Sequence, residues 1–189
     1  MEMRSLPPHL TLAINLSSRQ IQDERIAHRI LAVLSKTKFS PSRLEVELTE
    51  SALVNDIEAA KTVIRAFKRL GVRIALDDFG TGYSSLSYLS ELPFDKIKID
   101  RSFIRTLHNQ RESAKVVSAI VGLGKSLGVP IIAEGIETAR DEEVVRTMGC
   151  SIAQGFYYSQ PVPAVELPGL LAKTYGAAVK ALPQVVAVA

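Results

Sequence analysis

Short runs of apolar residues recur along the chain, and each run ends in a polar residue that can bind a metal ion or a phosphate. The runs are short and near-continuous, which is typical of parallel strands that are buried on both faces. We expect strands to begin near Thr11, Leu44, Arg73, Lys96, Pro130 and Ser151. The residues that end the runs are Asn15, Glu47, the pair Asp77-Asp78, Lys98, Glu134 and Gln154.

Between these runs, apolar residues recur at the three- and four-residue spacing that places them on one face of a helix. Three of these segments are followed by Gly71, Gly128 or Gly149, and glycine ends helices because it adopts the left-handed conformation at little cost. The pattern predicts helices over Asp23–Lys36, Asp56–Leu70, Ser84–Leu92, Glu112–Leu127, Thr138–Met148 and Val165–Lys173.

The alternation of strands and helices indicates an α/β protein with about six βα units around a parallel sheet. The carboxyl ends of parallel strands meet on one rim, where (β/α)8 barrels carry their active sites. A closed barrel of this kind needs eight strands, so a six-strand set leaves two unpaired edges. The simplest account is that two βα units normally precede this set and are absent from the present chain or its gene product. We also expect the present chain alone to be less stable than a whole barrel, or to associate through its edges.

Composition and charge narrow the class of protein. The 189 residues fit one domain or a large piece of one, and 47% of them are hydrophobic, as in soluble globular proteins. A net charge of +3, from 23 basic and 20 acidic residues, disfavours a nucleic-acid polymer as partner. The single Cys150 excludes an internal disulfide and fits a reducing cytoplasm. No apolar stretch approaches the ~20 residues that cross a bilayer, so we expect no membrane segment.

The adjacent carboxylates of Asp77 and Asp78 are the most specific candidates for chemistry. Two carboxylates at one strand end repel each other unless a cation lies between them. The alternative is that Asp77 caps a turn and that Asp78 is solvated. Glu47 and Glu134 each end another strand, which makes them candidate ligands at the same rim.

Other polar residues near the strand ends allow two interpretations each. Glu50 could brace the site or favour the positive end of a helix, and Glu137 could support the site or be a surface charge. Lys98 lies between two isoleucines, and an inward ammonium there could neutralise carboxylates and orient a water. An outward lysine under a helix would be costly to bury. Asn15 and Gln154 offer neutral oxygens but could equally satisfy backbone groups.

Taken together, the rim carries oxygen ligands and lacks a cluster of histidine or cysteine. Such ligands favour Mg²⁺ or Mn²⁺ over zinc. Two neighbouring aspartates suggest a pair of metal ions, the arrangement that cleaves phosphodiesters. The three histidines lie in predicted loops or on a helix, and we expect them and Cys150 to be structural.

Several segments then resemble, in order, the motifs of one family, the EAL domain, from about Leu10 to Lys173. The resemblance implies a (β/α)8 TIM-barrel-like fold, with a partial EAL domain over residues 1–176 and a C-terminal tail over 177–189. The matching segments are Asn15-Leu16-Ser17, Glu47-Leu48-Thr49-Glu50, Asp77-Asp78-Phe79-Gly80-Thr81-Gly82, Lys98-Ile99-Asp100, Ala133-Glu134-Gly135-Ile136-Glu137 and Gln154-Gly155.

The resemblance also implies an activity, since EAL domains hydrolyse cyclic di-GMP to linear pGpG with Mg²⁺ or Mn²⁺ in bacterial signalling. By this resemblance Lys98 would assist the attacking water and Glu134 would complete the metal and catalytic shell. Glu50 would brace the loop that follows Asp78. The implied metal ligands are Asn15, Glu47, Asp77, Asp78 and Glu134. Residues implied beside the substrate or behind the ligands are Glu50, Asp100, Glu137 and Gln154, and those of the regulatory loop are Phe79, Gly80, Thr81, Gly82, Tyr83, Ser84 and Ser85.

The family pattern further implies a homodimer, an upstream sensor or diguanylate cyclase domain, and a cytoplasmic location. One departure matters: the Glu-Ala-Leu tripeptide that names the family is absent from the 189 residues, and in the family its glutamate is a direct metal ligand. The chain could therefore be an impaired phosphodiesterase. The alternative is a non-catalytic module that binds cyclic di-GMP or a protein partner.

Overall fold

The computed structural model describes residue 7, residues 9–82 and residues 86–175. The predicted tail over 177–189 and the loop residues Tyr83, Ser84 and Ser85 lie outside the described residues.

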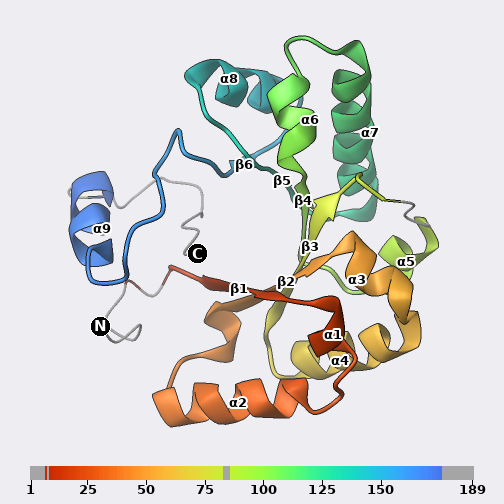
Figure 1. Ribbon diagram of the computed structural model, residues 1–189, viewed down its shortest axis with the longest axis vertical. Coiled ribbons are helices and arrows are strands. Elements are labelled where there is room, and N and C mark those ends of the chain that lie inside the picture. Colours follow the sequence, from red (N-terminus) through yellow and green to blue (C-terminus); the bar gives the residue numbers. More distant parts are fainter. Residues whose placement is uncertain (1–6, 8, 83–85, 176–189) are drawn as a thin grey trace.

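The centre of the molecule is a six-stranded sheet in which every neighbouring pair of strands is parallel (Figure 1). The strands follow one another across the sheet in chain order. This confirms the predicted α/β class and all six predicted strands. They are β1 (Leu12–Leu16), β2 (Leu44–Thr49), β3 (Arg73–Phe79), β4 (Lys96–Ile99), β5 (Ile131–Ala133) and β6 (Ile152–Ala153).

Helices connect the strands and cover one face of the sheet, with α2, α4 and α7 along its outside (Figure 1). The six predicted helices are present, and the short α1, α3 and α6 are additional because four to six residues hold too few turns to show a period. The helices are α1 (Ser18–Ile21), α2 (Ile26–Thr37), the 3₁₀ turn η2 (Pro41–Arg43), α3 (Glu50–Asn55), α4 (Ile57–Arg69), α5 (Leu86–Glu91), α6 (Arg101–Thr106), α7 (Arg111–Leu127), α8 (Ala139–Thr147) and α9 (Leu167–Tyr175).

The helix ends follow local chemistry. Thr138 caps α8, where its side chain accepts from the backbone N–H of Asp141 while the Asp141 carboxylate binds the backbone of Thr138. Gly128 ends α7 with φ 68°, as the pattern predicts. In contrast, α2 ends on Lys38 at φ 53°, a left-handed position that carries no glycine.

The two faces of the sheet differ in chemistry. Side chains such as Val46, Ile74 and Ile97 point to the helices and join the main hydrophobic core, which includes Phe67 of α4. Alternate residues point to the other face, and there β2 and β4 carry buried charges. Both strands are buried on both faces, as expected, although Leu44–Thr49 and Lys96–Ile99 alternate between apolar and polar residues.

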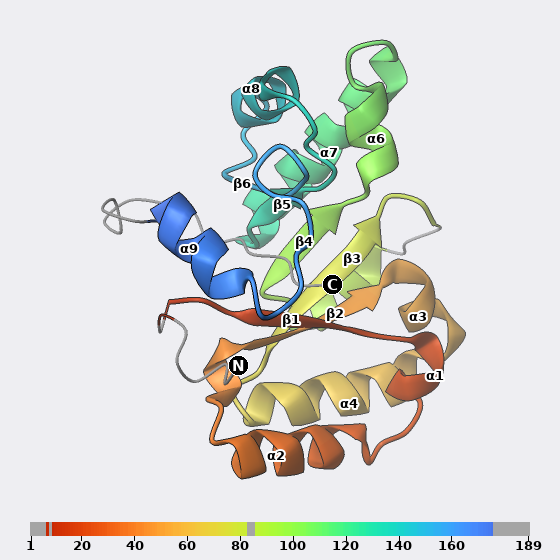
Figure 2. The same cartoon turned by 60° about the vertical axis from the view of Figure 1, so that its left-hand side comes forward.

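Among the described residues, β1 and β6 each pair on one side only, so the sheet is open. The last helix, α9, lies beside the start of β1 in both views (Figure 2), with Leu167 and Leu171 buried. Within the described part of the chain, no helix combines the length and apolar character needed to cross a membrane.

Candidate metal-binding active site

A single lysine lies at the centre of the polar face of the sheet. Lys98 on β4 is 2% exposed, and its Nζ is 2.7 Å from Glu134 Oε1, 2.9 Å from Glu47 Oε1 and 3.3 Å from Asp77 Oδ1. These carboxylates come from β2, from β3 and from the residue that follows β5. Four neighbouring strands therefore deliver their side chains to one place at their carboxyl ends.

The adjacent residues Asp77 and Asp78 reach this place through an irregularity in β3. In a regular strand, neighbours point to opposite faces. The pairing of β3 with β4 shifts between Leu76 and Phe79, where three steps along β3 match two along β4. Asp78 adopts φ 53°, a left-handed conformation that aspartate tolerates better than most residues. Its N–H donates to Asp77 Oδ1 at 3.0 Å.

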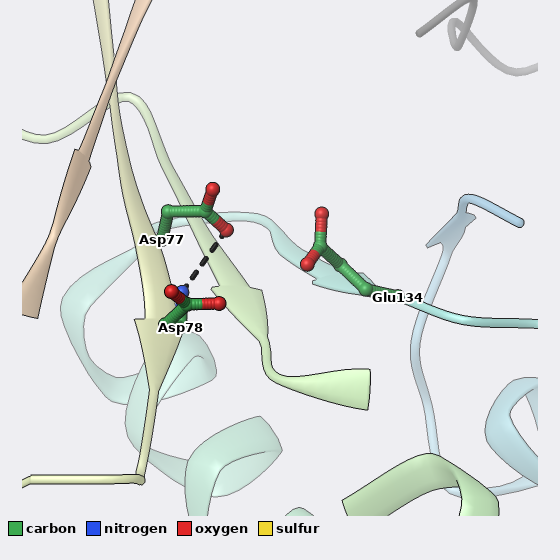
Figure 3. Close-up of side chains that lie close together, drawn as sticks. All are labelled: Asp77, Asp78 and Glu134. Atoms are coloured by element: carbon green, nitrogen blue, oxygen red, sulfur yellow. Dashed lines mark hydrogen bonds between the residues drawn. The ribbon is translucent and has the colours of Figure 1, made fainter. Parts of the chain in front are cut away.

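This bulge brings both aspartates toward Glu134, as Figure 3 shows. Carboxylate oxygens of Asp77, Asp78 and Glu134 all lie within 4.8 Å of one another. Adjacent carboxylates so placed could share a cation, and all of the donors are oxygens. The residues present therefore fit Mg²⁺ or Mn²⁺.

The site carries more carboxylates than ammonium groups. Burial raises the pKa of Glu47 and of Glu134, although the Lys98 ammonium acts in the opposite direction. Burial lowers the pKa of Lys98, but the carboxylates around it raise the pKa by more, so Lys98 remains an ammonium. Burial also raises the pKa of Asp78, and the charges of neighbouring aspartates add to this. A divalent cation would compensate this excess of negative charge.

Asp100 lies beside Asp78 and begins the next helix. Its carboxylate accepts from the N–H of Ser102 at 2.9 Å, which caps α6, and it also accepts from the Ser102 hydroxyl. Burial acts to raise the pKa of Asp100, but the hydrogen bonds from Ser102 hold it below its ordinary value. Asp100 is therefore charged at neutral pH and adds to the negative character of the rim.

The loop after β3 rests on Glu50. This residue opens α3, is 3% exposed, and accepts the N–H of Gly80 on Oε2 at 3.1 Å. A Cβ at Gly82 would lie 2.6 Å from Glu50 Oε1, so a side chain there would displace the Glu50 carboxylate. Thr81 closes the turn by donating its hydroxyl to the carbonyl of Asp78 at 2.9 Å. Glu50 thus joins the start of α3 to the backbone beside the aspartates.

The remaining predicted residues lie at different distances from the lysine cluster. Asn15 is exposed at the end of β1 and pairs in register with Glu47. Gln154 follows β6, where its N–H donates to the carbonyl of Ala133. Glu137 is exposed and forms an ion pair with Arg105 at 3.3 Å, away from Lys98. The structure thus brings together Glu47, Asp77, Asp78, Lys98 and Glu134.

Two polar side-chain pairs were not predicted. Lys96 forms an ion pair with Glu45 on the same face as Lys98, and the alternating pattern of β2 and β4 could have placed both residues on that face. His108 pairs with Asp141 between the α6–α7 connection and α8. They are 33 positions apart, and no spacing rule joins them.

Comparisons with known proteins identify the family of this chain. A family model described as "EAL domain" matches residues 1–161. Cyclic di-GMP phosphodiesterase PdeR of Escherichia coli (strain K12) is 43% identical over 157 residues, covering 83% of this chain and 24% of PdeR. The chain spans only 19%, 20% and 24% of three of the curated relatives that it matches.

Solved structures give the same picture. The PaMucR phosphodiesterase in complex with c-di-GMP is 41% identical with a TM-score of 0.80, covering 83% of this chain and 64% of that one. Klebsiella pneumoniae BlrP1 with manganese and c-di-GMP is 30% identical with a TM-score of 0.73, covering 79% of this chain and 38% of BlrP1. The family model spans most of the chain, and the fold agrees with these solved structures. The chain therefore belongs to the EAL domain family.

Proposed function

We propose that this chain is a cyclic di-GMP phosphodiesterase domain that forms pGpG with two Mg²⁺ or Mn²⁺ ions. The observation that carries the proposal is the contact of one buried ammonium, Lys98, with three strand-end carboxylates beside Asp78. The similarity to PdeR and PaMucR, both named as phosphodiesterases, supports the reaction. The manganese in the BlrP1 structure supports the cofactor.

The residues of the rim have separate tasks in this proposal. Divalent ions, when bound, would lower the pKa of water and stabilise charge on the phosphate. The ligands would be Asn15, Glu47, Asp77, Asp78 and Glu134. Lys98 Nζ would donate to the attacking water oxygen and hold it in line with phosphorus. A bond would form between that oxygen and phosphorus as the water gives up a proton, one phosphorus–ester oxygen bond would break, and the released alkoxide would take up a proton, so that no net proton is gained or lost.

Residues behind the ligands would keep the rim in shape. Glu50 would fix the loop after β3 through Gly80, and Asp100 would hold the start of α6 beside Asp78. Gln154 would lie at the edge of the substrate. Glu137 would act more remotely, since its ion pair is with Arg105. The regulatory role of residues 79–85 stays a prediction.

The test is the conversion of cyclic di-GMP to pGpG, followed by chromatography with Mg²⁺ or Mn²⁺ present. Lys98→Met and Glu134→Gln should each lower turnover by roughly 10²- to 10⁴-fold, the range for loss of a positioned proton-transfer or electrostatic group. Glu143→Gln, at an exposed position of α8, serves as the matched control and should be unaffected. Turnover in Lys98→Met equal to that of the unchanged chain would reject the proposal.

A second candidate function is binding of cyclic di-GMP without cleavage. It is favoured by the absence of the Glu-Ala-Leu tripeptide from the 189 residues. Calorimetry would then detect nucleotide binding that depends on the divalent ion, while no pGpG forms. Hydrolysis by the unchanged chain would exclude it.

We also propose a cytoplasmic homodimer that works with an upstream sensor or cyclase domain. The small share of PdeR that this chain covers supports further domains in the complete protein. Light scattering of the complete gene product would measure the assembly, and a monomer at all concentrations would reject the dimer.

A further inference from the structure

A second ion pair lies on the same face of the sheet as the candidate site. Lys96 Nζ is 2.7 Å from Glu45 Oε2, and both side chains are buried. Each partner precedes a residue of the site by two positions: Glu45 precedes Glu47 on β2, and Lys96 precedes Lys98 on β4. Two residues along a strand cover about 6.6 Å. The polar face therefore has two charged layers, the site and the Glu45–Lys96 pair below it.

The lower pair spans a strand. β2 and β4 do not pair with each other, because β3 lies between them. Ala75 on β3 is in register with Glu47 on one side and with Lys96 on the other, and it is fully buried. Its methyl group leaves room for long side chains from β2 and β4 to meet above the sheet. The same gap serves the contact of Glu47 with Lys98.

The Glu45 carboxylate depends on the charge of its partner. Among the described residues, Glu45 Oε2 has no hydrogen bond of good geometry. The cost of burying this carboxylate is therefore offset by the positive charge of Lys96, whose Nζ lies 2.7 Å away. A buried carboxylate without a cation is strongly unfavourable. The next ammonium on the same strand and face is Lys98, whose Nζ contacts the site carboxylates.

We infer that Glu45 and Lys96 are positioning residues that hold Lys98 in the upper layer. By satisfying each other, they leave the Lys98 ammonium to Glu47, Asp77 and Glu134. Without Lys96, the Glu45 carboxylate draws Lys98 down and away from Glu134. Without Glu45, the Lys96 ammonium competes with Lys98 for Glu47. The relevance of this to catalysis rests on the proposed function, but the placement of Lys98 does not.

The first test follows the Lys98 ammonium by NMR of ¹⁵N-labelled lysine, with its signal identified by its loss in Lys98→Met. Lys96→Met keeps the length of the side chain and removes the charge, and the Lys98 signal should shift or broaden. The double variant Glu45→Met with Lys96→Met should return the signal toward its original position. Lys115→Met, at an exposed position of α7, is the control and should leave the signal in place.

A second single variant guards against a folding failure. Glu45→Gln should also move the Lys98 signal, because Lys96 then turns toward Glu47. An unchanged Lys98 signal in either single variant, with native circular dichroism, would overturn the inference. In Lys96→Met, that result would arise if the Arg73 guanidinium, on the register neighbour of Glu45 on β3, replaced the lost ammonium.

Turnover separates this inference from the proposed function. In Lys96→Met, kcat should fall about 10- to 100-fold with little change in KM, as for residues that support metal sites, and the double variant should recover it. If the unchanged chain does not hydrolyse cyclic di-GMP, the proposed function fails, and the NMR signal still decides the positioning. If the signal moves while kcat does not, Lys98 has no catalytic role.

Discussion

At the scale of single residues, the main feature of the candidate site is that the sheet buries one ammonium among several carboxylates. Lys98 contacts three carboxylates, and Asp78 adds a fourth beside them. The residue types and their strand-end positions could be predicted from the sequence. The left-handed conformation of Asp78 could not, because it arises from pairing with β4 rather than from its own neighbours along the chain. The catalytic roles of these residues stay predictions.

Burial of a single thiol leads to a prediction about pH. Burial raises the pKa of Cys150 to about 11, so at pH 8 the thiolate is only roughly one part in a thousand. The native protein should therefore react slowly with a thiol reagent such as 5,5′-dithiobis(2-nitrobenzoate), and the rate should rise as the pH approaches 11. The protein unfolded in guanidinium is the control and should react at once. Equal rates in the two states would contradict a buried thiol.

At the scale of elements, periodic patterns were predictable and irregular contacts were not. The long helices α4 and α7 have apolar stripes that the spacing reveals, and their ends lie close to the predicted ones. α6 is set by the Asp100 cap and shows no repeat. The contact between the α6–α7 connection and α8 depends on His108 and Asp141, which only the folded chain brings together.

Asp141 should stabilise this junction in a pH-dependent way. Its carboxylate accepts from Thr138 N at 2.8 Å, from Glu137 N at 3.2 Å and from His108 Nε2 at 2.8 Å. Burial acts to raise the pKa of Asp141, but the hydrogen bonds from Thr138 and His108 lower it by more. Asp141→Asn should lower the free energy of unfolding at pH 7 by about 1–2 kcal/mol, as for loss of a cap.

The sign of the pH effect follows from the lowered pKa. The stabilisation by Asp141 is full above the unfolded pKa of about 3.9 and is lost as the pH falls through the lower folded value. Urea unfolding should therefore separate Asp141→Asn from the unchanged chain at pH 7 and bring the two together near pH ~2–3. Glu143→Gln on the exposed side of α8 is the control. A gap that persists in acid would mean that packing, and not the charge, is responsible.

At the scale of the whole molecule, the parallel order of six strands was predictable because each strand carries its own apolar run. Which charged side chains meet on the polar face of the sheet was only partly predictable. Alternation in β2 and β4 marks Glu45 and Lys96 as partners of that face, yet their meeting across β3 depends on the small Ala75 between them. Pairing partners across a sheet are set by tertiary structure, and the pattern of one strand does not contain them.

The open edges of the described sheet lead to a prediction about association. β1 and β6 each leave one side without a strand partner among the described residues, and unpaired edges are sites of strand addition. The purified 189-residue chain should therefore show a mass in light scattering that rises with protein concentration over a roughly tenfold range. A constant monomer mass, together with a cooperative melt at high temperature, would contradict this.

The extra residue in β3 has a consequence for anyone who would transplant this candidate metal site into a designed sheet. A regular strand of the same residue types would send one aspartate to each side and divide the cation's ligands between core and solvent. Deleting a single residue between Leu76 and Phe79 would likewise restore even pairing with β4 and dismantle the site without removing any other ligand. The irregular pairing, in which three steps along β3 match two along β4, is thus as necessary to the candidate site as the carboxylates themselves.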